Sequence, residues 1–227
     1  MDVLAELVSL IAPPRCPACR GAVGDPRAGL CDDCRAALPW LPPGRCRRCG
    51  LAAHRARSCP ARTAVLVRAW APMAYEGVAR RLVHELKFGG RLGVCETMAA
   101  QLAANLPADL RRSGAAVVPV PAHSGRRRAR GHDPVDALAA GLAGRAGLPL
   151  RRCLERMDAG ARQVGATRAE RTASGRMAVA VARRPVPSRV LLVDDVHTTG
   201  ATLEACARAL VAGGADRVAG VAYARAG

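Results

Sequence analysis

The most informative segment of the chain is Val190-Leu191-Leu192-Val193-Asp194-Asp195-Val196-His197-Thr198-Thr199-Gly200-Ala201-Thr202. Its first four residues are branched and apolar, a pattern typical of a strand that is buried on both faces in a parallel sheet. We expect this strand to end at the two acidic residues. Because ligands of open α/β sheets bind beyond the carboxyl ends of the strands, the pattern predicts that Asp194 and Asp195 lie at a binding site.

The residues after the acids favour a phosphate. Thr198 to Thr202 should open a helix, whose unpaired N–H groups and positive dipole end bind anions. Gly200 lets the backbone approach a phosphate closely, and the threonine hydroxyls are additional donors. The carboxylates accept hydrogen bonds from a diol or hold a metal ion, so the stretch as a whole predicts a ribose 5-phosphate ligand. The apolar positions of the helix are Leu203, Cys206, Ala207, Leu210 and Val211.

Residues 190–202 resemble the phosphoribosyl pyrophosphate (PRPP) motif of type I phosphoribosyltransferases. The resemblance implies that Asp194 and Asp195 bind the ribose 2′ and 3′ hydroxyls. It also implies that the 5′-phosphate is held by the following loop, which consists of Thr198, Thr199, Gly200, Ala201 and Thr202. An ordinary strand-turn-helix unit is the plain alternative. A nucleoside triphosphatase is excluded, because its phosphate loop requires lysine followed by serine or threonine, whereas the only lysine, Lys87, precedes Phe88.

The charge of the chain predicts anionic partners. Its net charge is +17, and all but one of its 35 basic residues are arginine. Such a balance attracts nucleic acid or pyrophosphate, although a coding bias toward arginine explains part of it. Hydrophobic residues make up 50% of the 227 residues and aromatic residues 2%, so the core should be aliphatic. This length accommodates one full domain and a small module.

Residues 1–12 carry no basic residue, and their apolar run is interrupted and ends at Pro13. They match neither a secretory signal nor a membrane span. We expect a short amphipathic helix instead, packed against the body of the protein. The chain should therefore be cytoplasmic, with no membrane insertion. In that compartment, paired cysteines hold metal more often than they form disulfides.

Two Cys-x-x-Cys pairs predict a structural zinc site. Cys16 and Cys19 form the first pair, and Cys31 and Cys34 follow eleven residues later. Each pair presents two thiolates on one side of a tight turn, and two such pairs complete a tetrahedral Zn²⁺ site. No coordination position is left open, so the metal would contribute folding energy rather than catalysis.

A second set of ligands is formed by Cys46, Cys49, His54 and Cys59. Its spacing resembles the zinc knuckle of retroviral nucleocapsid proteins, and zinc knuckles bind single-stranded nucleic acid. Two residues depart from that family, since Arg47 replaces a base-stacking aromatic residue and Ala53 replaces a glycine. A decayed zinc ribbon without metal is the alternative. Arginines gather in the same part of the chain and favour nucleic-acid contact; they are Arg45, Arg47, Arg48, Arg55, Arg57 and Arg62.

The density of cysteines falls after Cys59, which predicts a domain boundary at residue 62. Residues 1–62 would contain the N-terminal helix and a zinc-binding module, which is either a double zinc ribbon or a ribbon plus a knuckle. Residues 63–227 would form the second domain, which is phosphoribosyltransferase-like according to the resemblance described below. The segment from Tyr75 to Arg91 resembles the linking segment of the competence protein F (ComF) family. Members of that family join a cysteine module, this segment and a PRPP motif in the same order, and the resemblance covers nearly the whole chain.

The ComF resemblance implies an α/β fold, namely a type I phosphoribosyltransferase-like, Rossmann-type parallel sheet with a small N-terminal zinc-ribbon module. In the linking segment, Arg81, Lys87 and Arg91 would either contact a phosphate or lie on the solvent face of a helix. Helices are expected over residues 95–104 and 135–146, and strand regions over 117–121, 148–154 and 217–223. Residues 157–177 resemble the mobile hood over the active site, or else form a surface loop.

The loop after the strand at 117–121 is basic. In phosphoribosyltransferases the corresponding loop binds pyrophosphate, which implies this role for Arg126, Arg127 or Arg130, since guanidinium groups pair bidentately with phosphate oxygens. Many family members carry Gly-Phe-Asn-Gln after this loop, where the present chain has Gly131-His132-Asp133-Pro134. Asp133 would either help to bind magnesium or cap the helix that follows, and we favour the cap.

Three functions agree with these residues. In the first, a transferase binds Mg²⁺ with PRPP, and departure of pyrophosphate leaves an oxocarbenium-like ribose for an acceptor that the sequence does not name. In the second, a non-catalytic protein uses the same site to hold PRPP or a nucleotide end and handles single-stranded DNA during natural transformation, with DNA-uptake proteins as further partners. The third is a PRPP sensor whose zinc module binds another protein.

Overall fold

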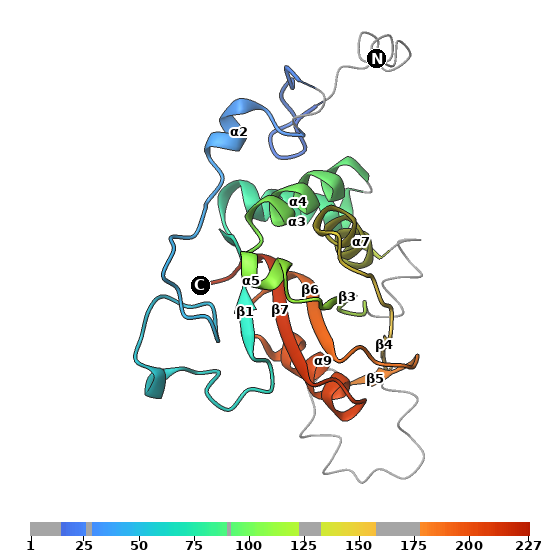
Figure 1. Ribbon diagram of the computed structural model, residues 1–227. Helices are drawn as coiled ribbons and strands as arrows, with labels where there is room; N and C mark the ends of the chain where they lie inside the picture. The colour runs from blue at the N-terminus through green and yellow to red at the C-terminus, as the bar shows by residue number, and fades with distance from the viewer. Residues whose placement is uncertain (1–14, 26–28, 90–91, 123–132, 158–177) are drawn as a thin grey trace, which may run out of the picture.

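The computed structural model describes residues 15–25, 29–89, 92–122, 133–157 and 178–227. Four predictions lie outside these ranges: the N-terminal helix, the role of Arg91, the loop with Arg126, Arg127 and Arg130, and nearly all of the hood. A parallel sheet forms the centre of the molecule, in the order β1-β7-β6-β3 with β2 also paired to β7 (Figure 1). Its strands are Arg68–Trp70 (β1), Met73–Ala74 (β2), Ala116–Pro119 (β3), Arg189–His197 (β6) and Arg217–Arg225 (β7).

Helices cover both faces of the sheet. One face carries three helices, Gly77–Phe88 (α3), Leu92–Asn105 (α4) and Pro134–Ala146 (α7), and the other carries Ala201–Ala212 (α9) (Figure 1). A short helix, Ala108–Arg111 (α5), precedes β3. Leu154–Arg156 (β4) and Val179–Val181 (β5) form a separate antiparallel pair. No helix in the described part of the chain is long and apolar enough to span a membrane.

Strand β6 is buried on both faces, as its sequence predicts. Leu191 and Val193 are in the core that includes α3, α4 and α7, whereas Val190 and Leu192 are in the core beneath α9. All four side chains are at most 2% exposed. The parallel neighbours β3 and β7 pair with both edges of β6. This central position fixes the direction in which the following residues leave the sheet.

The prediction that this strand ends at the acids was wrong. Strand β6 continues to His197, because β7 is equally long and pairs with it as far as the match of His197 with Arg225. Asp194 and Asp195 therefore lie within the last part of the strand. The helix after the loop is confirmed, with one exception among its apolar positions, since Val211 is 42% exposed while the other four are buried.

Other elements agree with the sequence to different degrees. Asp133 caps α7, because its Oδ1 accepts hydrogen bonds from the backbone N–H groups of Val135 and Asp136 at 3.1 and 3.2 Å. The strand expected over 148–154 is reduced to an isolated bridge between Leu150 and Val117, and β4 begins only at Leu154. The closing strand is confirmed and runs to Arg225.

The cysteine-rich segment lies against two parts of the second domain. Its first half contains the short helix Asp32–Ala36 (α2) and packs Leu30 and Leu38 into the core formed with α3 and α4. Arg20 also forms an ion pair with Glu85 of α3. The second half contains the turn Ala56–Ser58 (η2) and joins the edge strand β1, where the N–H of Ala69 donates to the carbonyl of Arg47 at 3.1 Å.

Candidate functional site

The two acids of the motif lie at the carboxyl end of β6, beside the last turn of α3. Lys87 of α3 places its Nζ 2.8 Å from Oδ2 of Asp195, whose side chain is 8% exposed. The sequence suggested Lys87 only as a contact for phosphate or as a solvent-facing residue. Its place in the linking segment was the one signal for a role at the site, and the structure shows that it neutralises a buried motif carboxylate.

Asp194 is a partly buried carboxyl group with an altered affinity for protons. Burial, followed by the negative charge of Asp195, raises the pKa of Asp194 to about 7, and Lys87 offsets part of the effect. The charge of Asp133 raises it further, so the cap of α7 also faces this site. Oδ1 of Asp194 accepts the N–H of Asp195 at 2.8 Å. The two adjacent acids thus differ, because Asp195 forms an ion pair with Lys87 whereas the pKa of Asp194 lies near neutral pH.

The loop after β6 has an open, glycine-dependent geometry. Gly200 precedes α9 with φ 82°, and a Cβ at this residue would lie 2.7 Å from Nε2 of His197. A side chain at this residue is therefore unfavourable on two grounds, the backbone conformation and the contact with His197. Thr198, Thr199 and Ala201 are exposed, and Thr202 is partly exposed. Oγ1 of Thr199 accepts the N–H of Ala201 at 3.3 Å, which leaves its own hydroxyl proton for a ligand.

A buried contact connects this loop to the second cysteine cluster. The guanidinium of Arg225, at the end of β7, lies 2.7 Å from Nδ1 of His197. Burial and the charge of Arg225 lower the pKa of His197 to about 4, so the neutral imidazole accepts this hydrogen bond. The same guanidinium is attracted by Cys49, and Gly50 lies close enough for a Cβ to come within 3.5 Å of it. Sequence reasoning missed Arg225, which carries no local motif.

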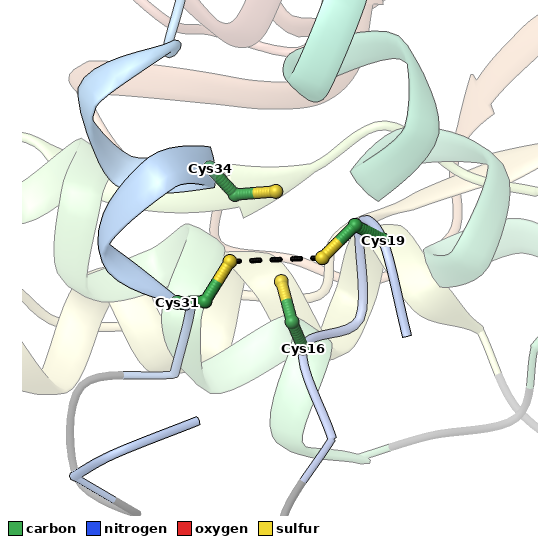
Figure 2. A group of neighbouring side chains, drawn as sticks. All are labelled: Cys16, Cys19, Cys31 and Cys34. Carbon is green, nitrogen blue, oxygen red and sulfur yellow. Dashed lines mark hydrogen bonds between the residues drawn. The ribbon is translucent and has the colours of Figure 1, made fainter. Parts of the chain in front are cut away.

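The first cysteine cluster has the geometry of a four-thiolate metal site. Cys16 and Cys19 come from one turn, Cys31 immediately precedes α2 and Cys34 lies within it, and their sulfur atoms face a common centre (Figure 2). The ligand atoms lie within 4.8 Å of one another, and the sulfurs of Cys19 and Cys31 are 3.6 Å apart. A Zn²⁺ ion with Zn–S bonds of about 2.3 Å requires sulfurs about 3.8 Å apart.

The second cluster brings Cys46, Cys49, His54 and Cys59 together within the same limit of 4.8 Å. Nε2 of His54 is 3.7 Å from the sulfur of Cys49, and Nδ1 lies 2.8 Å from the carbonyl of Ala52. This outer contact directs Nε2 toward the cluster, as is usual for a histidine ligand. The residues predicted for both sites are thus assembled, including the histidine.

The two clusters share one backbone turn. The N–H of residue 20 donates to the carbonyl of Cys16, and that of Gly50 to Cys46, each at 2.8 Å. Both donor residues have positive φ, 68° for Arg20 and 73° for Gly50. This repeat favours two zinc ribbons over a ribbon plus a knuckle.

The chemistry of both clusters fits a bound cation. All ten cysteines are free, and the sulfur separations exceed the 2.05 Å or so of a disulfide. Burial and the neighbouring thiols raise the pKa of Cys34 to about 12 and that of Cys49 to about 11. Grouped thiols cannot all ionise without a compensating positive charge, which structural Zn²⁺ would supply.

Comparison with known proteins identifies the N-terminal module and gives more distant similarities for the rest. Residues 7–62 match the model of the double zinc ribbon domain. The sequence has no match among curated proteins. One similar solved structure is glutamine PRPP amidotransferase from B. subtilis complexed with ADP and GMP, with 22% identity, 61% of this chain covered and a TM-score of 0.42. Another is the allosteric regulatory enzyme of purine biosynthesis, with 22% identity, 62% covered and a TM-score of 0.35. The alignments span 30% and 26% of those two longer chains.

Proposed function

We propose that this chain binds Mg²⁺-PRPP, or a ligand with the same ribose 5-phosphate group, at the carboxyl end of β6. The observation that carries the proposal is the direct succession of two acids and a glycine-dependent loop that opens α9. Asp194 and Asp195 would accept hydrogen bonds from the ribose diol. The N–H groups and hydroxyls of residues 198–202 would bind the 5′-phosphate. The resemblance of residues 190–202 to the PRPP motif supports these assignments.

The reaction proposed for the site is phosphoribosyl transfer. The bond from C1 to pyrophosphate breaks, the oxygen of pyrophosphate takes the electron pair, and a nucleophile forms a new bond to C1. Arg126, Arg127 and Arg130 are proposed to bind the departing pyrophosphate. Neutralisation of its charge is the chemistry that Mg²⁺ would add. Lys87 would hold the carboxylate of Asp195 in place, because the two groups already form an ion pair.

Pyrophosphate release from Mg²⁺-PRPP tests this reaction. Wild-type protein and the Asp194→Ala/Asp195→Ala variant are compared with and without a panel of nucleobases and single-stranded DNA, and PRPP binding is measured by calorimetry. Release that requires an acceptor and disappears in the variant supports a transferase. If the wild type does not bind PRPP at all, the ligand assignment is wrong.

A non-catalytic sensor of PRPP or nucleotides is the second candidate. The contact of His197 with Arg225, next to Cys49, favours it, because this contact joins the ligand loop to the second ribbon. A sensor would bind PRPP without releasing pyrophosphate under any of the conditions above. The same experiment therefore separates the two functions.

We also propose that the protein handles single-stranded DNA during natural transformation, with DNA-uptake proteins as partners. The resemblance to the ComF family supports this role, as does the net charge of +17. Arg47, Arg48 and Arg57 of the second ribbon are exposed and would contact the phosphates. Binding through phosphates releases counterions, so we expect affinity for DNA to fall steeply with salt. An affinity that hardly changes between low and moderate salt would contradict this role.

A further inference from the structure

Both tryptophans of the chain line one region of the surface, where the two ribbons meet the second domain. The first hollow, of about 650 Å³, lies between the first ribbon and α4 and is lined by Trp40. The second, of about 730 Å³, lies between the second ribbon and β1 and is lined by Trp40 and Trp70. Trp40 and Asn105 belong to both hollows, which are therefore adjacent. We call the two hollows together the ribbon trough.

The ribbon trough is lined by more basic than acidic side chains. Two carboxylates line it, Glu96 in the first hollow and Asp109 in the second. Asp109 pairs with Arg47 and Arg68, and Glu96 pairs with Arg145. The side chain of Arg47 is nonetheless 73% exposed. Arg35 pairs with Asp32 at the surface. In all, six arginines line the trough beside the two acids: Arg15, Arg35, Arg45, Arg47, Arg68 and Arg145.

Trp40 stands on a fixed backbone between the hollows. Its neighbours are bonded to the segment around β2, since Leu41 donates to the carbonyl of Pro72 and Ala74 donates to that of Pro39, each at 2.8 Å. The indole is nevertheless 45% exposed, in a chain whose aromatic content is only 2%. A rigid, half-exposed indole beside guanidinium groups is the arrangement that stacks an unpaired base and neutralises its phosphates.

We propose that the ribbon trough binds single-stranded nucleic acid, with a base stacked on Trp40 and the flanking phosphates on arginines of the two hollows. This inference gives a location to the nucleic-acid role proposed above and rests on it. Duplex DNA keeps its bases stacked inside the helix and offers no face to Trp40. An acidic peptide would use the arginines but would leave the indole without a partner.

Intrinsic fluorescence provides a direct test, because the chain has no tryptophan outside the trough. The zinc-loaded protein is titrated with oligo(dT) at low salt. We expect tryptophan emission to be quenched in the wild type and in Trp70→Phe, where Trp40 is the only reporter. Binding of a labelled oligonucleotide, followed by anisotropy, should weaken at least about fivefold in Trp40→Ala. Trp40→Phe retains an aromatic face and should recover part of this loss.

Charge variants provide the matched controls. Arg45→Ala/Arg47→Ala should weaken oligonucleotide binding more than Arg151→Ala/Arg183→Ala, which removes the same charge from exposed positions outside the trough. Zinc content and melting temperature verify that each variant is folded. PRPP binding in the same preparations reports separately on the β6 site.

Three results would overturn the inference. One is oligonucleotide binding without quenching and with no loss in Trp40→Ala, which would leave the DNA role intact but place it elsewhere. Another is binding of duplex DNA or polyglutamate as tight as that of oligo(dT), which would make the trough a general anion surface. The third is a wild type that binds PRPP but no oligonucleotide, which would refute the DNA role as well.

Discussion

At the scale of single residues, Asp194 should make stability depend on pH. Its pKa is raised from an ordinary value of 3.8 to about 7, so the folded state holds this proton more tightly than the unfolded state. The contribution of Asp194 to the free energy of unfolding is therefore lost as pH rises from about 4 to about 7. We expect Asp194→Asn to stabilise the protein by on the order of 1–3 kcal/mol at pH 8 and little at pH 4.

Denaturant unfolding at pH 4, 6 and 8 measures this effect. Asn keeps an acceptor for the N–H of Asp195, so the local hydrogen bond is retained. Asp32→Asn is the control, because the side chain of Asp32 is 95% exposed and pairs with Arg35 at the surface. A stabilisation of Asp194→Asn that does not depend on pH would show that the charge of Asp194 is not its cause.

The candidate site residues of β6 and its loop are contiguous in the sequence, so their motif could be recognised without the structure. Their partners could not. Lys87 and Arg225 contact Asp195 and His197 from other elements, and no local pattern connects residues that meet only after the sheet and α3 have packed. Zinc ligands were easier, since metal coordination imposes short, regular spacings. Even there, only the assembled turn showed that residues 46–59 repeat the geometry of the first ribbon.

At the scale of elements, the junction between β6 and α9 depends on Gly200. Gly200→Ala would force φ 82° on a residue with a Cβ and bring that atom close to His197. We expect a loss of about 1–2 kcal/mol in stability and a much larger loss of affinity for PRPP, because the loop must shift. Gly144→Ala in α7 is the control, since a Cβ there meets nothing within 4 Å and should be neutral or stabilising. Calorimetry and thermal unfolding of both variants measure the contrast.

The N-terminus of α7 tests the role of Asp133. Asp133→Ala should cost about 1 kcal/mol, because two backbone N–H groups lose their acceptor. Asp133→Asn retains an acceptor and should cost much less. Equal destabilisation by the two substitutions would mean that the charge of Asp133, rather than its capping, is what matters. Thermal unfolding of the three proteins decides this.

Element boundaries were predicted less well than element types, and the errors have a common physical source. The acids at 194–195 look like the end of a strand, yet pairing with β7 extends β6 to His197. Residues 148–154 read as a strand, but only Leu150 pairs with Val117 before the chain turns away to form β4. Partners supplied by tertiary structure decided both boundaries. The Asp133 cap was predicted correctly because capping is a local interaction.

At the scale of the whole molecule, the two ribbons have different positions relative to the β6 site. The first packs on α3 and α4 through Leu30 and Leu38. The second places Cys49 beside Arg225, whose guanidinium contacts His197 beneath Gly200. The described residues thus connect the loop after β6 directly to the second ribbon.

The last prediction follows from the different positions of the two ribbons relative to the β6 site. Cys59→Ser, which disrupts the second cluster, should weaken Mg²⁺-PRPP binding by about fivefold. Without an intact cluster, Cys49 would no longer be held as a thiolate beside Arg225, so the guanidinium would lose this favourable interaction. Cys19→Ser disrupts the first cluster and should leave PRPP affinity nearly unchanged. Zinc content and melting temperature are measured for both variants, so that PRPP affinities are compared only between folded proteins.

A double-mutant cycle then tests whether the second cluster affects PRPP binding through Arg225. If the effect of the second cluster passes through the guanidinium, Arg225→Ala should weaken PRPP binding by itself, and adding Cys59→Ser should cause little further loss. Additive losses would mean that the second ribbon acts by another path. Equal losses from Cys19→Ser and Cys59→Ser would instead mean that both ribbons affect the site only through overall stability. The route through Arg225 requires unequal single effects together with a non-additive double effect.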